Sequence, residues 1–201
     1  MNHISEYDWI KTKCGIADIS HIGQVLIFDR GAEKFITELT SSKVKNLNEG
    51  DIDYLSITNT ESDIIVGKIM KDCYFILITS GDIKDTINNI RNNLPDNVDM
   101  KEMKQDSLIS ISGNNSDNVI NDILGINLEE MEYMTIIEAQ LDDDVTSAYI
   151  SKLGNADNYL YKISVPDFVA EDLWDSLISH EDVKEISITT SEKIYSDIKK
   201  N

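Results

Sequence analysis

Residues 63–94 read DIIVGKIMKDCYFILITSGDIKDTINNIRNNL, and the pattern of these residues indicates the fold class. Two isoleucine-rich runs, 63–70 and 73–79, are separated by two polar residues, which is hairpin spacing. A helix is expected over 82–93, because apolar residues there form one stripe: Ile83, Ile87, Ile90 and Leu94. Asp82 suits the N-cap and Pro95 lies just past the end. The pattern predicts a helix packed on a sheet that contains 73–79.

The same patterns continue on both sides of this stretch. Further strands are expected at 22–28, 98–103, 108–111, 134–141, 148–153, 159–165 and 183–188. Further helices are expected at 32–39, 116–124 and 167–178, followed by a polar helical tail. Strands cluster in twos and threes, which predicts an α+β fold with antiparallel or mixed sheets. An acidic segment after the helix at 116–124 suggests a boundary, so residues 1–127 and 128–201 are predicted as an N-terminal α+β domain and a second small subdomain packed with it.

Composition limits the partners of the chain. Its 201 residues include 18 basic and 37 acidic side chains, giving a net charge of −19. Such a charge repels phosphate backbones and anionic lipid, so neither nucleic acid nor a membrane surface is an expected partner. The apolar runs are too short to cross a bilayer, and the N-terminal residues do not resemble a signal peptide. With only Cys14 and Cys73 as cysteines, these features predict a reduced, cytoplasmic protein.

Common catalytic and metal motifs are missing from the sequence. The three histidines are far apart, and there is no paired Cys-x2-Cys or Walker glycine pattern, so no metal site is predicted. Asp142-Asp143-Asp144 is interpreted as a solvated turn, because no EF-hand spacing accompanies it. Cys14 has only His21 as a conceivable base partner, which disfavours a nucleophilic role. Composition and spacing lead to an acidic α+β protein and no further.

A family resemblance extends this interpretation. Residues 15–25, GIADISHIGQV, resemble the G-[LI]-x-D-[VI]-S-H-M-G signature of the aminomethyltransferase (glycine cleavage T-protein) family. The likeness continues in register through the helix at 32–39, the strand entry GDIDY at 50–54, SDIIV at 62–66, LISISG at 108–113, the segment 153–166 and Leu173-Trp174. It covers almost the whole chain.

The resemblance implies an α+β fold in which interlocked domains surround a tetrahydrofolate site. The family continues into a C-terminal β-barrel, whereas this sequence ends at Asn201, so an interlocked two-domain form without that barrel is expected. In this respect the chain is also similar to the short gamma subunit of heterotetrameric sarcosine oxidase, which resembles a truncated T-protein.

The resemblance also implies roles for five residues. Asp63 stands at the position of the family's catalytic aspartate, and Tyr54 at that of a folate-facing tyrosine. Thr79 stands at the usual asparagine, Asn155 at a tyrosine, and Lys162 at the glutamate that grips the pterin. Asp63 is therefore the predicted catalytic residue, and the other four are predicted to bind substrate, with tetrahydrofolate as the implied cofactor.

Two departures from the family pattern predict weak tetrahydrofolate binding. The pterin edge presents two donors, N3–H and the 2-amino group, and a lysine at 162 has only donors to offer them. Each unpaired donor in a closed pocket costs about 1–3 kcal/mol. The loop before Asp63 is also shorter than in the family, with Thr60-Glu61-Ser62 in place of paired glycines that allow close backbone approach.

Two classes of function remain open. The first is an aminomethyltransferase-like enzyme that moves a one-carbon unit to tetrahydrofolate from an aminomethyl donor, with a lipoyl carrier as protein partner. The second is a non-catalytic subunit or regulatory binding module, with oxidase subunits as partners. The retained Asp63 favours the first class, whereas Lys162, the lost glycines and the missing barrel favour the second.

Overall fold

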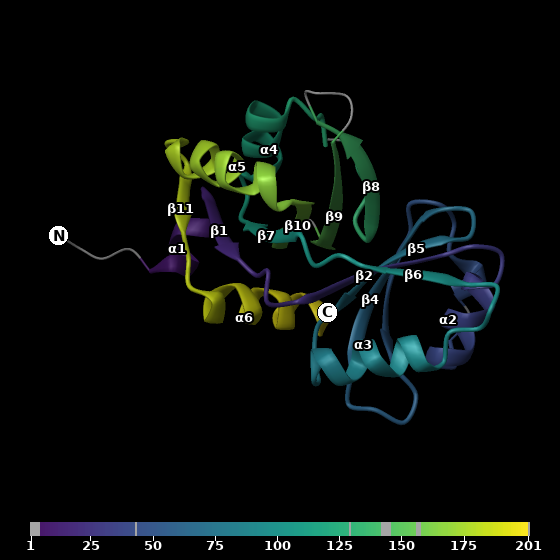
Figure 1. Cartoon of the computed structure of the whole chain (residues 1–201). Helices are drawn as coiled ribbons and strands as arrows, with labels where there is room; N and C mark the ends of the chain where they lie inside the picture. The colour runs from purple at the N-terminus through teal and green to yellow at the C-terminus, as the bar shows by residue number, and fades with distance from the viewer. Residues whose placement is uncertain (1–4, 43, 129, 142–145, 156–157, 201) are drawn as a thin grey trace. The chain divides into compact units, whose positions relative to one another are not determined.

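The computed structural model describes residues 5–42, 44–128, 130–141, 146–155 and 158–200 (Figure 1). The chain divides into two compact units. Residues 21–104 form one of them, which we call the inserted unit. Residues 1–20 and 105–201 form the other, which we call the discontinuous unit. The fold is α+β, as the sequence predicts, and one unit interrupts the other in sequence.

The inserted unit contains an antiparallel five-stranded sheet in the order β3-β4-β5-β2-β6. Its strands are β2 (Gly23–Phe28), β3 (Ile52–Ser56), β4 (Asp63–Met70), β5 (Cys73–Ile78) and β6 (Asp99–Glu102). Its helices are α2 (Ala32–Thr40), the 3-10 turn η1 (Val44–Asn46) and α3 (Ile83–Asn92). The predicted hairpin is confirmed as β4 and β5, with a register shift between Lys68 and Met70.

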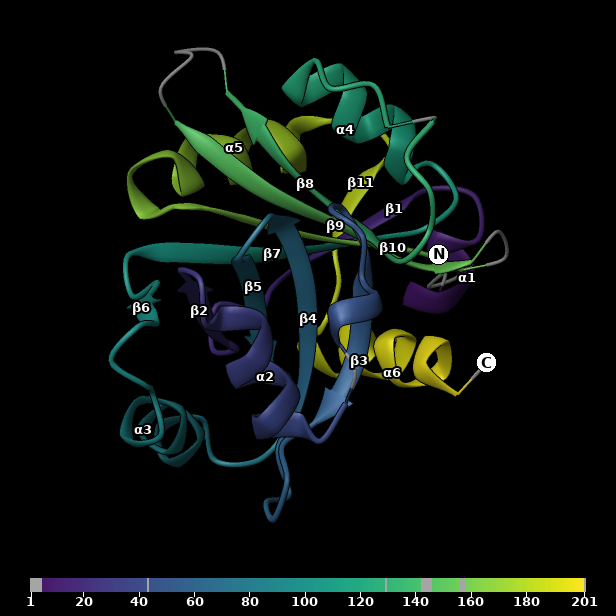
Figure 2. The same cartoon turned by 90° about the vertical axis from the view of Figure 1, so that its right-hand side faces the viewer.

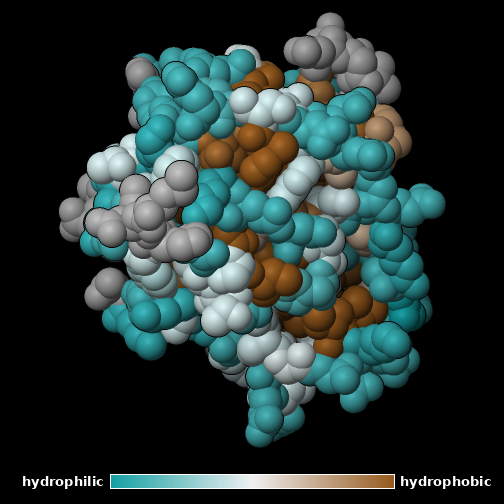
Figure 3. Space-filling view, turned by 90° about the vertical axis from the view of Figure 1, so that its left-hand side faces the viewer, coloured by the Kyte–Doolittle hydropathy of each residue, from teal (hydrophilic) through white to brown (hydrophobic). Residues whose placement is uncertain are grey.

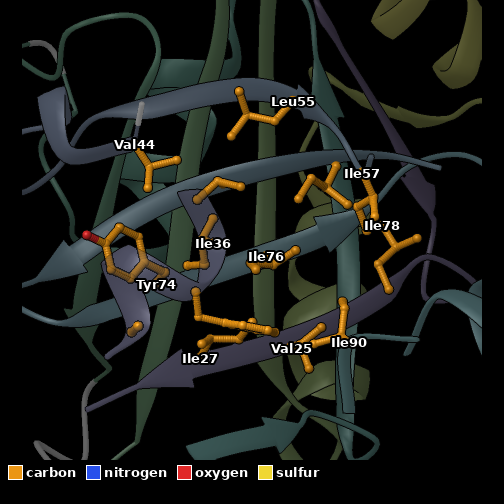
Figure 4. Packing of buried hydrophobic residues seen from close by; sticks show 14 of the residues in the cluster. Val25, Ile27, Ile36, Val44, Leu55, Ile57, Tyr74, Ile76, Ile78 and Ile90 are labelled. Carbon is orange, nitrogen blue, oxygen red and sulfur yellow. The ribbon is translucent and has the colours of Figure 1, made fainter. Parts of the chain in front are cut away.

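Helices α2 and α3 cover the same face of this sheet (Figure 2). Ile90 of α3 belongs to one buried cluster with Ile76 and Ile78 of β5 (Figure 4). Ile87 of α3 is a member of the same cluster. Ile36 of α2 joins the same cluster. The stripe expected over 82–93 therefore packs where it was predicted to pack. Asp82 caps the helix, since its side chain accepts a hydrogen bond from the backbone N–H of Asp85.

The discontinuous unit contains a six-stranded sheet in the order β11-β1-β7-β10-β9-β8. Its strands are β1 (Cys14–Asp18), β7 (Asp106–Ser112), β8 (Thr135–Gln140), β9 (Ser147–Asn155), β10 (Asn158–Pro166) and β11 (Val183–Glu185). Its helices are α1 (Glu6–Ile10), α4 (Ser116–Leu124), α5 (Asp167–Ser179) and α6 (Ile188–Lys199). Helices α4 and α5 pack on one face through a shared apolar cluster, and α6 lies on the other, where Ser191 donates to Ser110 Oγ at 2.9 Å (Figure 1).

The predicted boundary between residues 127 and 128 does not coincide with the observed division. Strand β1 pairs in parallel with β11 and antiparallel with β7, so the N-terminal segment belongs with the C-terminal half. Strands β7 and β10 also pair, which joins the two sides of the expected boundary in one sheet. Hydrogen bonds between distant segments, rather than the acidic stretch near 130, decide where the units separate.

The strand predicted over 183–188 is too long. Strand β11 ends at Glu185, and the side chain of Ser187 caps α6 by accepting from the N–H of Thr190 at 3.2 Å. Helix α6 is also less polar than the expected tail, because it buries Ser191, Ile194 and Ile198. Strand β1 and the short helix α1 were not predicted from periodicity.

Hydrophobic residues reach the surface of one face as separate patches among hydrophilic ones (Figure 3). The large apolar side chains that are exposed include Met70, Phe168, Ile178 and Ile188. Within the described ranges, no helix is both long enough and apolar enough to cross a membrane.

Candidate functional site

Tyr54, Asp63 and Thr79 share one face of the sheet in the inserted unit. Tyr54 is opposite Ile65, two residues along β4 from Asp63, so both side chains leave the same face of the pleat. Asp63 accepts the N–H of Thr79 through its carbonyl oxygen, at 2.9 Å. The register places these residues on the face opposite α2 and α3, because Ile64 and Ile78 point into the cluster beneath the helices. Three of the five predicted site residues thus lie on adjacent strands or, in the case of Thr79, directly after one.

The carboxylate of Asp63 is held in place by the neighbouring strand. Ser56 Oγ donates to Asp63 Oδ1 at 2.6 Å across the β3–β4 pair. Asp63 also donates its backbone N–H to Ser80 Oγ at 2.9 Å. The carboxylate is half-buried at the first residue of β4. A fixed, partly solvated carboxylate can accept hydrogen bonds from an amine or orient it.

Thr79 has a structural bond besides its place on this face. Its hydroxyl donates to the carbonyl oxygen of Asp63 at 3.1 Å, which ties the end of β5 to the start of β4. A threonine hydroxyl used in this way has its hydrogen committed to the backbone. The hydroxyl group of Thr79 therefore helps to position Asp63, and its hydrogen is not available to a ligand while this bond is made.

The loop from Thr58 to Ser62 is braced against α3. Ser62 is 5% exposed, and its hydroxyl lies 2.6 Å from that of Thr86 on α3. Within the loop, Thr60 Oγ1 donates to the Ile57 carbonyl at 2.9 Å and accepts the N–H of Ser62. Polar side chains therefore hold the conformation of this loop, and its residues 60–62 lack the open backbone that glycine would offer a ligand. A cavity of about 660 Å³ lies beside it, between α2 and α3, and Asp63 is not among its lining residues.

Lys162 and Asn155 lie on one face of the sheet in the discontinuous unit but are not in contact. Lys162 on β10 is opposite Ser151 on β9, and Asn155 is four residues further along β9. Four residues of strand span about 13 Å, so the two side chains leave the same face at separate points. This is the face on which α6 lies.

The ammonium group of Lys162 is buried against an aromatic ring. Lys162 is 3% exposed, and its Nζ lies 4.6 Å from the ring centroid of Tyr195 on α6. Among the described residues, no carboxylate lies within ion-pairing distance of this nitrogen. Burial lowers the pKa of Lys162 to about 8, and the charge of Glu192 opposes this shift. At position 162 the structure therefore has a partly desolvated cation and no hydrogen-bond acceptor.

The structure shows neighbours of Asp63 and, separately, of Lys162 that the sequence did not indicate. Ser56 and Ser80 hold Asp63, and Tyr195 covers Lys162. Strand register could have identified Ser56, since it is opposite Asp63 when Tyr54 is opposite Ile65. Nothing local identifies Tyr195, because its contact with Lys162 joins elements that are far apart in sequence.

The other chemical candidates remain without a site. Within the described residues, no group of three or more histidine, cysteine, aspartate or glutamate side chains could hold a metal ion. Asp142-Asp143-Asp144 lies outside the described residues. Cys14 is fully buried 3.7 Å from Ser116 Oγ, and desolvation raises its thiol pKa to about 12. A thiol with such a pKa is a poor nucleophile at neutral pH.

The fold is that of the aminomethyltransferase class. It matches the glycine cleavage system aminomethyltransferase T from Bartonella henselae with a TM-score of 0.78 and 17% sequence identity, over 89% of this chain and 49% of that one. A chain of the heterotetrameric sarcosine oxidase from Corynebacterium sp. U-96 matches with a TM-score of 0.62 and 11% identity, over 87% of this chain and 88% of that one.

The sequence places the chain in one family. The model of the GCVT N-terminal domain matches residues 2–192, and the chain belongs to this family. Curated aminomethyltransferases from Halothermothrix orenii and Chloroherpeton thalassium are 21% and 24% identical to it, over 87% and 86% of this chain. The chain spans about half the length of these relatives, 50% and 49%.

Proposed function

We propose that this chain is an aminomethyltransferase-like module of folate-dependent one-carbon metabolism that binds tetrahydrofolate only weakly by itself. The observation that carries the proposal is the buried Lys162, whose Nζ lies against the ring of Tyr195. The family resemblance assigns to this position the glutamate that accepts two hydrogen bonds from the pterin. Asp63 remains at the position of the catalytic carboxylate and is held by Ser56.

Tetrahydrofolate does not fit these residues in the manner that the resemblance implies. The pterin edge needs an acceptor, and the protonated ammonium group of Lys162, which predominates at neutral pH, has only donors to offer it. The loop before Asp63 adds to the mismatch, because Ser62 is bonded to Thr86 where the family has glycines. We therefore assign no chemical step to tetrahydrofolate on this chain.

A second candidate function is a non-catalytic subunit of a larger folate-linked assembly. One observation favours it: the likeness to a chain of heterotetrameric sarcosine oxidase extends over 88% of that chain, whereas the likeness to the T-protein covers 49%. In this case lipoyl carrier proteins would not be partners, and oxidase-type subunits would be. A cytoplasmic location stays a prediction for either candidate.

Calorimetric titration of the purified chain with tetrahydrofolate tests the proposal. Loss of two pterin contacts at a few kcal/mol together weakens a micromolar ligand by about two to three decades, so we expect no saturation below about 100 μM. Transfer of an aminomethyl group from a loaded lipoyl carrier is expected to be undetectable.

Two results would contradict this account. One is micromolar tetrahydrofolate affinity of the unmodified chain. The other is measurable aminomethyl transfer that Asp63→Asn abolishes while Asp99→Asn, a substitution at an exposed carboxylate of β6 in the same unit, leaves it intact.

A further inference from the structure

An apolar groove lies on the surface of the discontinuous unit, where α4, α5 and the residue after β8 meet. Its volume is about 280 Å³. Its apolar lining consists of Ile123, Leu124, Leu141, Val169 and Leu173, and its polar lining of Thr146, Asp172 and Ser176. Apart from Leu173, which is 7% exposed, the apolar residues are only partly buried, although they pack against the core cluster beneath them.

An exposed aromatic residue extends this groove. Phe168 is 74% exposed, and it directly precedes the groove residue Val169 on α5. It is also one helical turn from Asp172, so it stands on the same side of the groove as that carboxylate. An apolar groove continued by an exposed phenylalanine is typical of a surface that binds a partner.

The elements around the groove carry charge of one sign. The segment 113–128, which includes α4, contains two acidic residues, Asp117 and Asp122, and no lysine, arginine or histidine. The segment 163–179, which includes α5, contains four acidic residues and again no basic one. Asp122, Glu171, Asp172 and Asp175 are exposed on α4 and α5. One basic side chain lies close to this rim: His180 Nε2 is 3.6 Å from Asp122 Oδ2.

This combination selects one kind of occupant. A second copy of the chain would bring a net charge of −19 against an acidic rim, so self-association through this face is disfavoured. A partner segment with lysine or arginine on one side and leucine-like residues on the other would complement both the rim and the floor. In such a complex the apolar insertion supplies most of the affinity, and the charges supply encounter rate and selectivity.

We propose that the α4–α5 groove is a docking site for a basic amphipathic segment of a partner protein. An apolar side chain of that segment fills the groove between Leu124 and Val169, and its basic residues face Asp122 and Asp172. The site is independent of Lys162 and Asp63 and would operate whether or not the chain binds tetrahydrofolate.

A designed peptide serves as the probe. It is a fluorescein-labelled leucine–lysine peptide of roughly 18 residues, patterned as an amphipathic helix. Its control carries glutamate in place of every lysine. Fluorescence anisotropy at physiological salt measures affinity, and backbone amide chemical shifts locate the bound peptide. We expect saturable binding of the basic peptide with shifts concentrated in α4 and α5.

Substitutions then distinguish the groove from general attraction to an acidic protein. Val169→Asp places a charge in the groove and should weaken binding about tenfold or more, and Asp172→Lys should weaken it roughly threefold to fivefold. Asp99→Lys makes the same charge change on β6 of the inserted unit and should alter the affinity less than about twofold. This small change reflects the lower net negative charge of the whole protein, an effect that salt screens. A melting curve confirms that Val169→Asp is folded.

Several results would overturn the proposal. These are equal binding of the acidic peptide, equal weakening by Asp99→Lys and the groove variants, or shifts outside α4 and α5. Sedimentation that shows a dimer dissociated by Val169→Asp would assign the groove to a second copy and would also contradict the proposal.

Discussion

Two buried lysines on neighbouring strands, Lys162 and Lys152, have opposite surroundings. Lys152 Nζ lies 3.4 Å from Asp117 Oδ2, donates to the Leu128 carbonyl at 3.2 Å, and contacts the rings of Tyr133 and Tyr161. Lys162 Nζ faces the Tyr195 ring without such an ion pair among the described residues. The charge of Lys152 is compensated by these partners, whereas the buried charge of Lys162 lowers the stability of the folded chain.

The pH dependence of stability should therefore depend on Lys162. Its pKa is lowered from 10.5 to about 8 in the folded chain. Between these values the unfolded chain holds a proton that the folded chain has released, so stability rises with pH across that window. Below about pH 8 the lysine is charged in both states and the full penalty is present.

Lys162→Met removes this penalty. At pH 7 we expect the variant to be about 1–3 kcal/mol more stable than the natural chain, and the difference should shrink toward pH 10.5. Urea unfolding at several pH values measures it, and the difference between proteins cancels the titration of other groups. Lys152→Met is the matched control, since it leaves Asp117 without its cation and should destabilise by about 1–3 kcal/mol. Destabilisation of both variants alike would show that Lys162 is compensated.

At the scale of single elements, α3 is held to its sheet mainly by its isoleucine stripe. Ile87 is 6% exposed within the cluster that contains Ile76 and Ile78. Ile87→Ala should lower the free energy of unfolding by about 2–5 kcal/mol, because it leaves a cavity in a packed core. Lys84→Ala, on the exposed side of the same helix, should change it by less than about 0.5 kcal/mol. A urea midpoint unchanged by Ile87→Ala would refute the packing of α3.

Elements with strong internal periodicity were predictable from the sequence. Helices α3, α4 and α5 and the β4–β5 hairpin appear within one or two residues of the expected bounds. Strand β1 was not predicted, because it is defined by partners in β7 and β11, which are far from it in the sequence. Helix α1 has only five residues, too few for a repeating apolar pattern.

The candidate site was predictable in part for the same reason. A hairpin formed by the runs 63–70 and 73–79 has Asp63 and Thr79 at the same end, and the N–H of Thr79 donates to the Asp63 carbonyl there. The burial of Lys162 was not predictable, since a strand lysine is ordinarily exposed and Tyr195 reaches it from a helix expected to be polar. Local pattern determines neighbours within an element, whereas burial depends on what packs upon it.

At the scale of the whole molecule, pairing between strands that are distant in the sequence determines which segments form each unit. The segments before residue 21 and after residue 104 join in one sheet through β1, β7 and β11. The inserted unit begins and ends on its own paired strands, β2 and β6. A composition shift near residue 130 could not reveal this, because parallel and antiparallel pairing between distant strands has no local sequence signal.

The claim that Lys162 replaces the pterin acceptor is tested most directly by three substitutions at that residue. Tetrahydrofolate is titrated by calorimetry into the natural chain and into Lys162→Glu, Lys162→Gln and Lys162→Met. Glutamate and glutamine both supply an acceptor oxygen, and glutamine does so without adding a buried charge near Glu192.

We predict that the Glu and Gln variants bind at least about tenfold more tightly than the natural chain, and that the Met variant does not. Micromolar binding by the natural chain, or an equal gain from Lys162→Met and Lys162→Gln, would contradict the account.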